Sequence, residues 1–131
     1  MTALDVRELR TLNSSDEWTT ACAYDYLLPN RGVAVLLPTG EQAALFRLDD
    51  GSLRSVGNID PFAGAAVMSR GLVGDRKGEP TVASPLLKQV FSLDSGICLD
   101  DPARVLGVFE VRVRDGLVEI RPAQVPRQPK Q

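Results

Sequence analysis

Turn-forming residues recur along this chain and divide it into short runs with the composition of β-strands. Proline, aspartate and glycine mark turns at residues 38–41, 49–52 and 115–116. In the last two, an Asp-Gly pair can supply the positive backbone φ that a tight hairpin needs. The runs on either side of these turns are therefore predicted to pair as antiparallel hairpins.

The clearest predicted strand is residues 108–114, which read Val-Phe-Glu-Val-Arg-Val-Arg. Phe109, Val111 and Val113 fall on one side, and charged residues alternate with them on the other. A period of two is typical of a half-buried strand with one wet face. The other predicted strands are residues 18–23, 33–37, 42–48, 53–56, 81–83 and 117–120, and residues 24–28 are predicted to form one helical turn.

Glycine concentrates in the middle of the chain, where the strand pattern fades. Residues 57–78 hold five of the eleven glycines and keep no helical or strand period for long. A long irregular stretch inside a compact domain is usually a binding or functional loop. We therefore predict an all-β fold, a β-sandwich of hairpins, with a loop-rich subdomain inserted between the hairpin regions.

The length of 131 residues corresponds to about one domain. We place that domain at residues 18–121. Residues 1–17 are acidic with few large apolar groups, and they are predicted to be a loosely ordered lead-in. Residues 122–131 hold three prolines and no acid, and they are predicted to be a disordered tail.

Histidine is absent from the sequence, and only two cysteines are present. Because histidine is the commonest general base and metal ligand, a Ser-His-Asp triad, a Cys-His pair and a histidine metal site are excluded. Two cysteines cannot supply four thiolates to a metal. We expect Cys22 and Cys98 to be reduced, small buried residues. No catalytic residue and no metal ligand is predicted.

The charge pattern narrows the partners further. The formal net charge of −2 offers no basic excess to neutralise phosphates, so nucleic acid is not an expected partner. The longest runs without a charge, such as residues 32–40, fall well short of the roughly 20 residues of a membrane span. Four charges interrupt residues 1–12, so we predict no signal peptide and expect a cytoplasmic protein.

Two central segments resemble the cluster-binding loops of Rieske iron–sulfur proteins. Residues 60–65 read Asp-Pro-Phe-Ala-Gly-Ala, against Cys-Pro-His-x-Gly-Ala in that family. Residues 84–96 resemble the second loop, Cys-Pro-x-His-Gly-x-x-Phe-x-x-x-x-Gly. The residues that match outside the ligand positions are Pro61, Gly64, Pro85, Phe91 and Gly96. The resemblance implies a Rieske-like fold across residues 18–121.

All four ligand positions of this resemblance hold other residues. Asp60 and Ser84 stand where the family has cysteines, and Phe62 and Leu87 stand where it has histidines. A Rieske centre needs two thiolates and two imidazoles, and phenylalanine and leucine have no lone pair to donate. We therefore expect no [2Fe–2S] cluster, and no one-electron transfer by this chain.

The same region is similar to one particular family, the small subunits of cytoplasmic NAD(P)H-dependent assimilatory nitrite reductases. Residues 58–62, 72–75 and 83–86 carry this similarity. In that family the large subunit carries sirohaem, a [4Fe–4S] cluster, FAD and the NAD(P)H site, and it reduces nitrite to ammonium. The resemblance implies a non-catalytic small subunit that binds no cofactor itself and has that large subunit as its partner. The alternative is a stand-alone protein-interaction module on a cluster-less scaffold, serving another oxidoreductase complex.

Two hypotheses describe the altered loops. In the first, Phe62 and Leu87 fill the space of a cluster, while Asp60 and Ser84 hydrogen-bond to loop amides or to each other and Lys88 serves as a counter-ion. In the second, the loops expose an apolar docking surface. The docking residues would be Pro61, Phe62, Pro85, Leu86 and Leu87. A Phe62→Asp variant separates the two: filling predicts a destabilised protein, and docking a folded one that no longer binds.

The remaining motifs are interpreted structurally. Residues 71–78 combine glycines with a basic pair but lack the spacing of a phosphate-binding loop, so we interpret them as a flexible loop. Arg70, Arg76 and Lys77 could still meet an acidic partner surface. The carboxylate pairs at 49–50 and 100–101 fall at turns, where turn-forming and capping roles are expected in place of acid–base chemistry.

Overall fold

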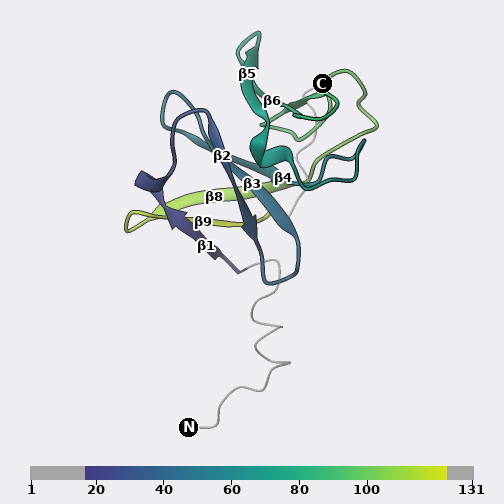
Figure 1. The fold of residues 1–131 in the computed structure, drawn as a ribbon. Coiled ribbons are helices and arrows are strands. Elements are labelled where there is room, and N and C mark those ends of the chain that lie inside the picture. Colours follow the sequence, from purple (N-terminus) through teal and green to yellow (C-terminus); the bar gives the residue numbers. More distant parts are fainter. Residues whose placement is uncertain (1–16, 124–131) are drawn as a thin grey trace.

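Six antiparallel strands form one sheet in the order β1-β9-β8-β4-β3-β2 (Figure 1). The computed structural model describes residues 17–123, so the predicted lead-in and tail lie almost entirely outside the described residues. The strands of this sheet are β1 (Thr19–Ala23), β2 (Arg31–Leu36), β3 (Gln42–Arg47), β4 (Leu53–Gly57), β8 (Val108–Arg114) and β9 (Leu117–Pro122). The predicted all-β class and the hairpin pairing are confirmed.

Two hairpin regions that are far apart in the sequence join to make this sheet. The meander β2-β3-β4 meets the hairpin β8-β9 where Ser55 pairs with Phe109 and Val56 pairs with Val108. The β8-β9 turn is built by Asp115 and Gly116, whose φ angles of 54° and 79° define the tight turn that the Asp-Gly pair predicts. The predicted helical turn is also present, as the short 3-10 helix η1 (Tyr24–Tyr26).

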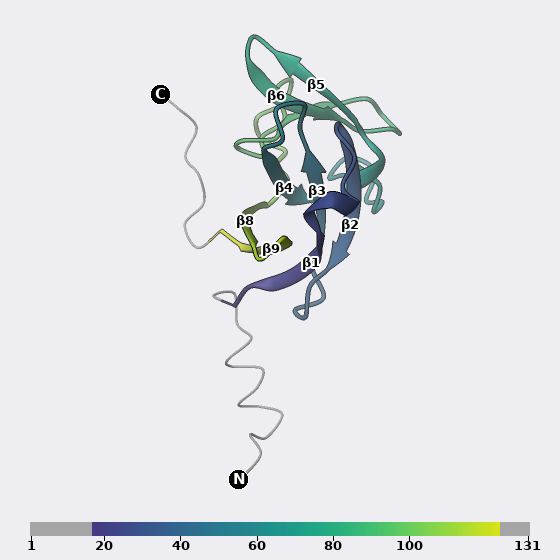
Figure 2. The same ribbon diagram turned by 90° about the vertical axis from the view of Figure 1, so that its left-hand side faces the viewer.

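The sheet folds over and encloses an apolar core between its two halves. Side chains of β2 and β3 pack there against side chains of β8 and β9, although these strands are not neighbours in the sheet. The buried residues of this sheet core are Leu27, Val35, Leu37, Ala43, Leu45, Phe109, Val118 and Ile120. A sandwich of hairpins is therefore the observed architecture (Figure 2).

The predicted wet face of β8 is partly covered. Arg112 forms an ion pair of 2.6 Å with Glu119, and both Arg112 and Arg121 stack on the Trp18 ring at 4.2 and 4.4 Å from its centroid. The apolar side also differs from the expectation, since Val113 is 48% exposed. The β4–β8 pairing ends at Ser55 and Phe109, so the far end of β8 lacks that neighbour.

The segment between β4 and β8 forms a second sheet of three strands, in the order β5-β6-β7. It contains η2 (Met68–Arg70), β5 (Leu72–Arg76), β6 (Glu79–Ala83) and β7 (Val90–Ser92). The prediction of a flexible loop at residues 71–78 is wrong, because β5 pairs with β6 along its whole length. Gly74 and the charged residues of β5 hide the strand period in the sequence.

This insert shares a second core with the large sheet. Phe46 and Val56 of the sheet pack with buried residues of the insert. The insert core comprises Ala44, Phe46, Val56, Met68, Val82, Phe91, Leu93, Cys98 and Leu106. The insert begins and ends at one place, where the Gly57 amide donates to the Gly107 carbonyl at 2.7 Å. Cys22 and Cys98 are both free thiols; Cys98 is buried as expected, whereas Cys22 is only partly buried.

Candidate functional site

The two loops that carry the motif lie together, joined by Asp60 and Ser84. The Ser84 hydroxyl donates to the Asp60 carboxylate, with 2.5 Å between Oγ and Oδ2, and both residues are fully buried. The first loop, residues 58–67, follows β4, and the second loop, residues 84–89, connects β6 to β7. The sheet topology thus brings together two positions that are 24 residues apart.

Asp60 also organises its own loop. Its Oδ1 accepts hydrogen bonds from the amides of Phe62 at 2.8 Å and Ala63 at 3.3 Å. The backbone closes the same turn, since the Gly64 amide donates to the Asp60 carbonyl at 2.7 Å. A buried carboxylate is costly unless its oxygens are hydrogen-bonded, and here both oxygens have partners. Asp60 therefore serves as the internal anchor of the first loop.

Ser84 has the equivalent place in the second loop. Its amide donates to the Gln89 carbonyl at 2.9 Å, and its carbonyl accepts from the Lys88 amide at 3.0 Å. Its hydroxyl oxygen also accepts from the Leu86 amide at 3.3 Å. The hydrogen bonding of Asp60 and Ser84 to loop amides and to each other agrees with the first hypothesis for the altered loops.

The backbone supports the match of the second loop to the Rieske motif. Lys88 stands where that motif has glycine, and its φ of 65° lies in the left-handed region that glycine favours. The Lys88 side chain is exposed, and among the described residues it forms no ion pair with Asp60. The predicted counter-ion role of Lys88 is therefore absent from this arrangement.

Phe62 turns toward the insert core. Its ring lies 6.2 Å from the ring of Phe91, with an interplanar angle of 58°, and it is only partly buried. Arg104 covers the other part, with its guanidinium carbon 5.1 Å from the Phe62 centroid. Arg104 also donates to the Pro61 carbonyl at 3.1 Å. The Phe62 ring is thus half-buried between Phe91 of the insert core and Arg104 of the segment before β8.

The second loop presents its apolar side chains to solvent. Leu86 is 50% exposed and Leu87 is 53% exposed, and Pro85 beside them is exposed too. The five predicted docking residues therefore divide into two groups. Pro61 and Phe62 are half-buried, while Pro85, Leu86 and Leu87 form an exposed apolar tip on a loop with a hydrogen-bonded base.

These side chains do not fit a Rieske centre. Both Asp60 oxygens are engaged by the protein, and Phe62 and Leu87 offer no donor atom. Within residues 17–123 no group of three or more histidine, cysteine or acidic side chains is arranged to hold a metal. The arrangement has the parts of a binding surface, and we identify in it no nucleophile, acid–base pair or metal ligand.

Arg104 is the site residue that the sequence reasoning missed. It follows a turn in which its own amide donates to the Asp101 carbonyl at 2.9 Å. Nothing in its local sequence signals a partner 43 residues earlier. The Asp100-Asp101 pair that precedes it was predicted to form a turn, and this backbone hydrogen bond is consistent with that role.

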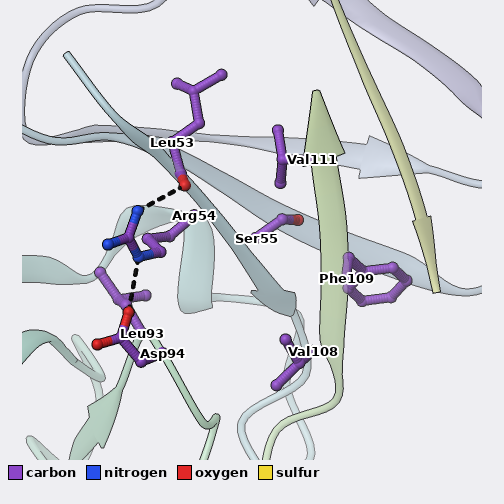
Figure 3. Close-up of a pocket in the computed structure, with 8 residues that line it drawn as sticks. All are labelled: Leu53, Arg54, Ser55, Leu93, Asp94, Val108, Phe109 and Val111. Carbon is purple, nitrogen blue, oxygen red and sulfur yellow. Dashed lines mark hydrogen bonds and ion pairs between the residues drawn. The ribbon is translucent and has the colours of Figure 1, made fainter. Parts of the chain in front are cut away.

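A hollow lies on the sheet where β4 and β8 part, with a volume of about 280 Å³ (Figure 3). Arg54 and Asp94 border it and form an ion pair of 2.7 Å. Arg54 also donates to the Leu53 carbonyl at 3.0 Å. The charges at this rim therefore neutralise each other, and the other lining groups offer no reactive side chain apart from the Ser55 hydroxyl. That hydroxyl is bonded to the Ala44 carbonyl.

The folded-over sheet, the three-stranded insert and the two motif loops together define a Rieske-like domain. The family model described as a Rieske-like [2Fe-2S] domain matches residues 17–121. More specifically, the chain belongs to the family of nitrite reductase (NADH) small subunits. The Escherichia coli K12 protein of that name is 42% identical over 106 residues, covering 80% of this chain and 97% of its own length.

A solved structure shows the same relationship. An NADH-dependent nitrite reductase small subunit from Mycobacterium tuberculosis is 60% identical to this chain and superposes with a TM-score of 0.79. The match covers 83% of this chain and 97% of that chain. The predicted fold and family are therefore confirmed. No helix within residues 17–123 is long and apolar enough to cross a membrane.

One relative is a much larger protein. The nitrite reductase [NAD(P)H] large subunit of Klebsiella oxytoca is 38% identical to this chain over 105 residues. Those residues make up 79% of this chain but only 11% of the large subunit. A domain of this family therefore occurs within a large-subunit chain.

Proposed function

We propose that this chain is the non-catalytic small subunit of a cytoplasmic NAD(P)H nitrite reductase. The observation that carries the proposal is its near full-length similarity to small subunits of that enzyme. The large subunit would hold the sirohaem, [4Fe–4S], FAD and NAD(P)H groups and reduce nitrite to ammonium. The small subunit contributes to that enzyme by binding to the large subunit.

In this proposal the chain binds no [2Fe–2S] cluster. The hydrogen bond between Asp60 and Ser84 takes over the task of joining the two loops, and the half-buried Phe62 packs against Phe91 in the insert core. Neither interaction carries an electron. The loops then keep a fixed shape without redox chemistry.

The Klebsiella relative supports the choice of partner. In one organism the two domains occur in one chain, and in another a homologue of one of them is a separate chain. The simplest requirement common to both arrangements is that the two domains associate physically. This chain matches 11% of that large subunit. The large subunit is accordingly the partner that we propose.

The contact that we propose for that partner is the exposed tip formed by Pro85, Leu86 and Leu87. Two half-exposed leucines on a loop with a hydrogen-bonded base give apolar area without a large ordering cost on binding. Phe62 and Arg104 fix the other loop, through the contact of Phe62 with Phe91 and of Arg104 with Phe62 and Pro61. Leu87 would then contact the partner, and Phe62 would hold the loop that faces it.

The test is co-purification of the tagged full chain from cells grown on nitrate or nitrite. We expect a large partner with sirohaem absorbance and NAD(P)H-dependent nitrite reduction, and no stoichiometric iron on the small chain after the two are separated. A colourless, unpartnered chain under these conditions would contradict the subunit proposal and favour a stand-alone interaction module. Iron at one cluster per separated chain would contradict the cluster-less proposal alone.

A further inference from the structure

An apolar groove lies where the insert rejoins the large sheet, away from the leucine tip. Its volume is about 370 Å³. Its walls come from the last segment of the insert, the start of β8 and the end of β9. The apolar lining residues include Ile97, Val105, Leu106, Phe109, Pro122 and Ala123. None of the residues of the motif loops lines this groove.

The groove is open and its walls are fixed. Val105 is 54% exposed, and a Cβ atom built on Gly107 would meet nothing within 4 Å. The backbone around them is held, because Ile97 bridges to Val105 and the Leu106 amide donates to the Gly96 carbonyl at 2.7 Å. A preformed, mainly apolar hollow is typical of a site that binds a ligand or a chain segment.

The described part of the chain ends inside this groove. The Ala123 amide donates to the Val108 carbonyl at 3.1 Å, next to the pairing of Pro122 with Phe109. Residues 124–131 follow directly and lie outside the described residues. A segment tethered this closely has an effective concentration on the order of millimolar at the groove, so that even a weak contact is populated. A separate molecule has no such advantage.

The residue types of this segment match the groove. Residues 124–131 read Gln-Val-Pro-Arg-Gln-Pro-Lys-Gln, with two basic residues and no acid. Val125 and Pro126 come first after Ala123 and are apolar, and their proline restricts the free chain, which lowers the entropy lost on binding. Arg127 is four residues beyond Ala123, a reach of about 13 Å when extended.

The rim of the groove carries one charge, on Glu41. The Glu41 side chain is exposed, its Oε1 accepts from the Thr39 hydroxyl at 3.1 Å, and among the described residues it forms no ion pair. An acidic rim above apolar walls therefore faces a segment that is apolar and then basic.

The other charges near the groove are engaged elsewhere. Next to the lining residues, Asp94 pairs with Arg54 and Arg121 pairs with Glu110. Arg104 precedes Val105, but its guanidinium group is turned to the Phe62 ring and the Pro61 carbonyl. None of these side chains neutralises Glu41.

We propose that residues 124–131 bind in this groove of their own chain. Val125 and Pro126 cover the apolar walls at Val105 and Leu106, and Arg127 approaches Glu41. The proposal gives a bound state to a segment for which composition alone predicts disorder. The groove is then closed by the chain itself, and Pro85, Leu86 and Leu87 remain the apolar surface that is available to a partner.

The segment allows a matched pair of variants in the full-length chain. Val125→Asp and Gln128→Asp change the net charge equally, but only the first removes an apolar side chain. Val105→Ser changes the groove instead, at a position that is already half exposed. All three substitutions lie at exposed or terminal positions, and their effect on the fold is checked by thermal unfolding.

The measurement is nuclear magnetic resonance of the isotopically labelled full chain. We expect nuclear Overhauser contacts between the methyl groups of Val125 and Val105, and their loss in Val125→Asp. The amide shifts of Ile97, Leu106 and Gly107 should move with Val125→Asp and stay in place with Gln128→Asp. Glu41→Gln and added salt should each weaken the contacts, because they remove or screen the attraction to Arg127. Absent contacts, together with groove shifts that ignore Val125→Asp, would overturn the proposal.

The same samples distinguish other occupants. In a mixture of labelled and unlabelled chains, contacts that arise only between different chains would assign the groove to a second copy and overturn the proposal. Groove shifts that ignore Val125→Asp but move when the purified large subunit is added would assign it to that partner, with the same consequence. Either result leaves the proposed subunit role standing, because that role rests on family similarity and not on the groove.

Discussion

The Ser84 hydroxyl and the Asp60 carboxylate share a hydrogen bond of 2.5 Å in a fully buried position. Each residue is also the hydrogen-bonded centre of its own loop, through the Phe62 amide in one case and the Leu86 amide in the other. A single side-chain contact therefore couples two turns of the backbone. Its loss is expected to loosen both loops together.

A Ser84→Ala variant should lower the free energy of unfolding by about 1–3 kcal/mol, because it leaves a buried carboxylate oxygen without its donor. Asp60→Ala should cost at least as much, since it removes the acceptor of two loop amides as well. Urea unfolding followed by fluorescence measures both. The exposed Thr39 provides a control, because Thr39→Ala should change stability by less than about 0.5 kcal/mol. Equal effects at positions 39 and 84 would contradict the anchoring role.

Phe62 and Leu87 should behave differently, although both stand where the Rieske motif has histidine. Phe62→Ala should lower stability by about 2 kcal/mol, because the half-buried ring packs on Phe91 and under Arg104. Leu87→Ala should leave stability nearly unchanged, because its side chain is already half exposed. Thermal unfolding measures both stability effects, and affinity for the large subunit measures the separate docking role proposed for Leu87. A Phe62→Asp chain that is as stable as wild type would show that Phe62 is a docking residue.

Trp18 should act as a clamp on the outer face of β8 and β9. Its ring contacts the guanidinium groups of Arg112 and Arg121, which also pair with Glu119 and Glu110. Trp18→Ala should destabilise the fold by about 1–3 kcal/mol, while Trp18→Phe retains a ring and should recover part of that loss. Chemical denaturation of the three proteins tests this order. Equal stability of the alanine and phenylalanine variants would rule out the stacking contribution.

Asp50 should make stability depend on pH at the β3-β4 turn. Hydrogen bonds from the Ser52 hydroxyl, and then from the Ser52 amide, hold the pKa of the Asp50 carboxyl below its ordinary value of 3.8. A carboxyl with a lowered pKa in the folded state stabilises above its ordinary pKa, and that contribution is lost as the pH falls through the folded-state value. The stability difference between wild type and Asp50→Asn should therefore narrow below about pH 4. A difference that stays constant from pH 6 to pH 2 would contradict this linkage.

The hairpins could be predicted because local signals determine them. Asp115 and Gly116 adopt the positive φ angles that their residue types favour, and β8 has the bounds that the alternation of residues 108–114 indicates. β5 could not be predicted in the same way. Its Leu-Val-Gly-Asp-Arg sequence has no period of two, and the strand depends on pairing with β6. Tertiary pairing here overrides a weak local preference.

The candidate site likewise has parts that local sequence signals predict and parts that depend on tertiary contacts. The motif spacing located Asp60 and Ser84, and their mutual hydrogen bond was one of the expected possibilities. The different fates of Phe62 and Leu87 depend on which side of each loop faces the insert core, and neighbouring residues in the sequence do not encode that. Arg104 reaches Pro61 across 43 residues. Such a contact can be recognised only when both segments are folded.

The insert leaves and rejoins the large sheet at a single point, where the amide of Gly57 meets the carbonyl of Gly107. The sheet core on the other side contains no residue of the loops that carry the motif. Substitutions at the four motif positions therefore act on the insert and its shared core, and they do not alter the packing of the sheet core itself. The fold can therefore be conserved in evolution while the residues that would bind a cluster are replaced.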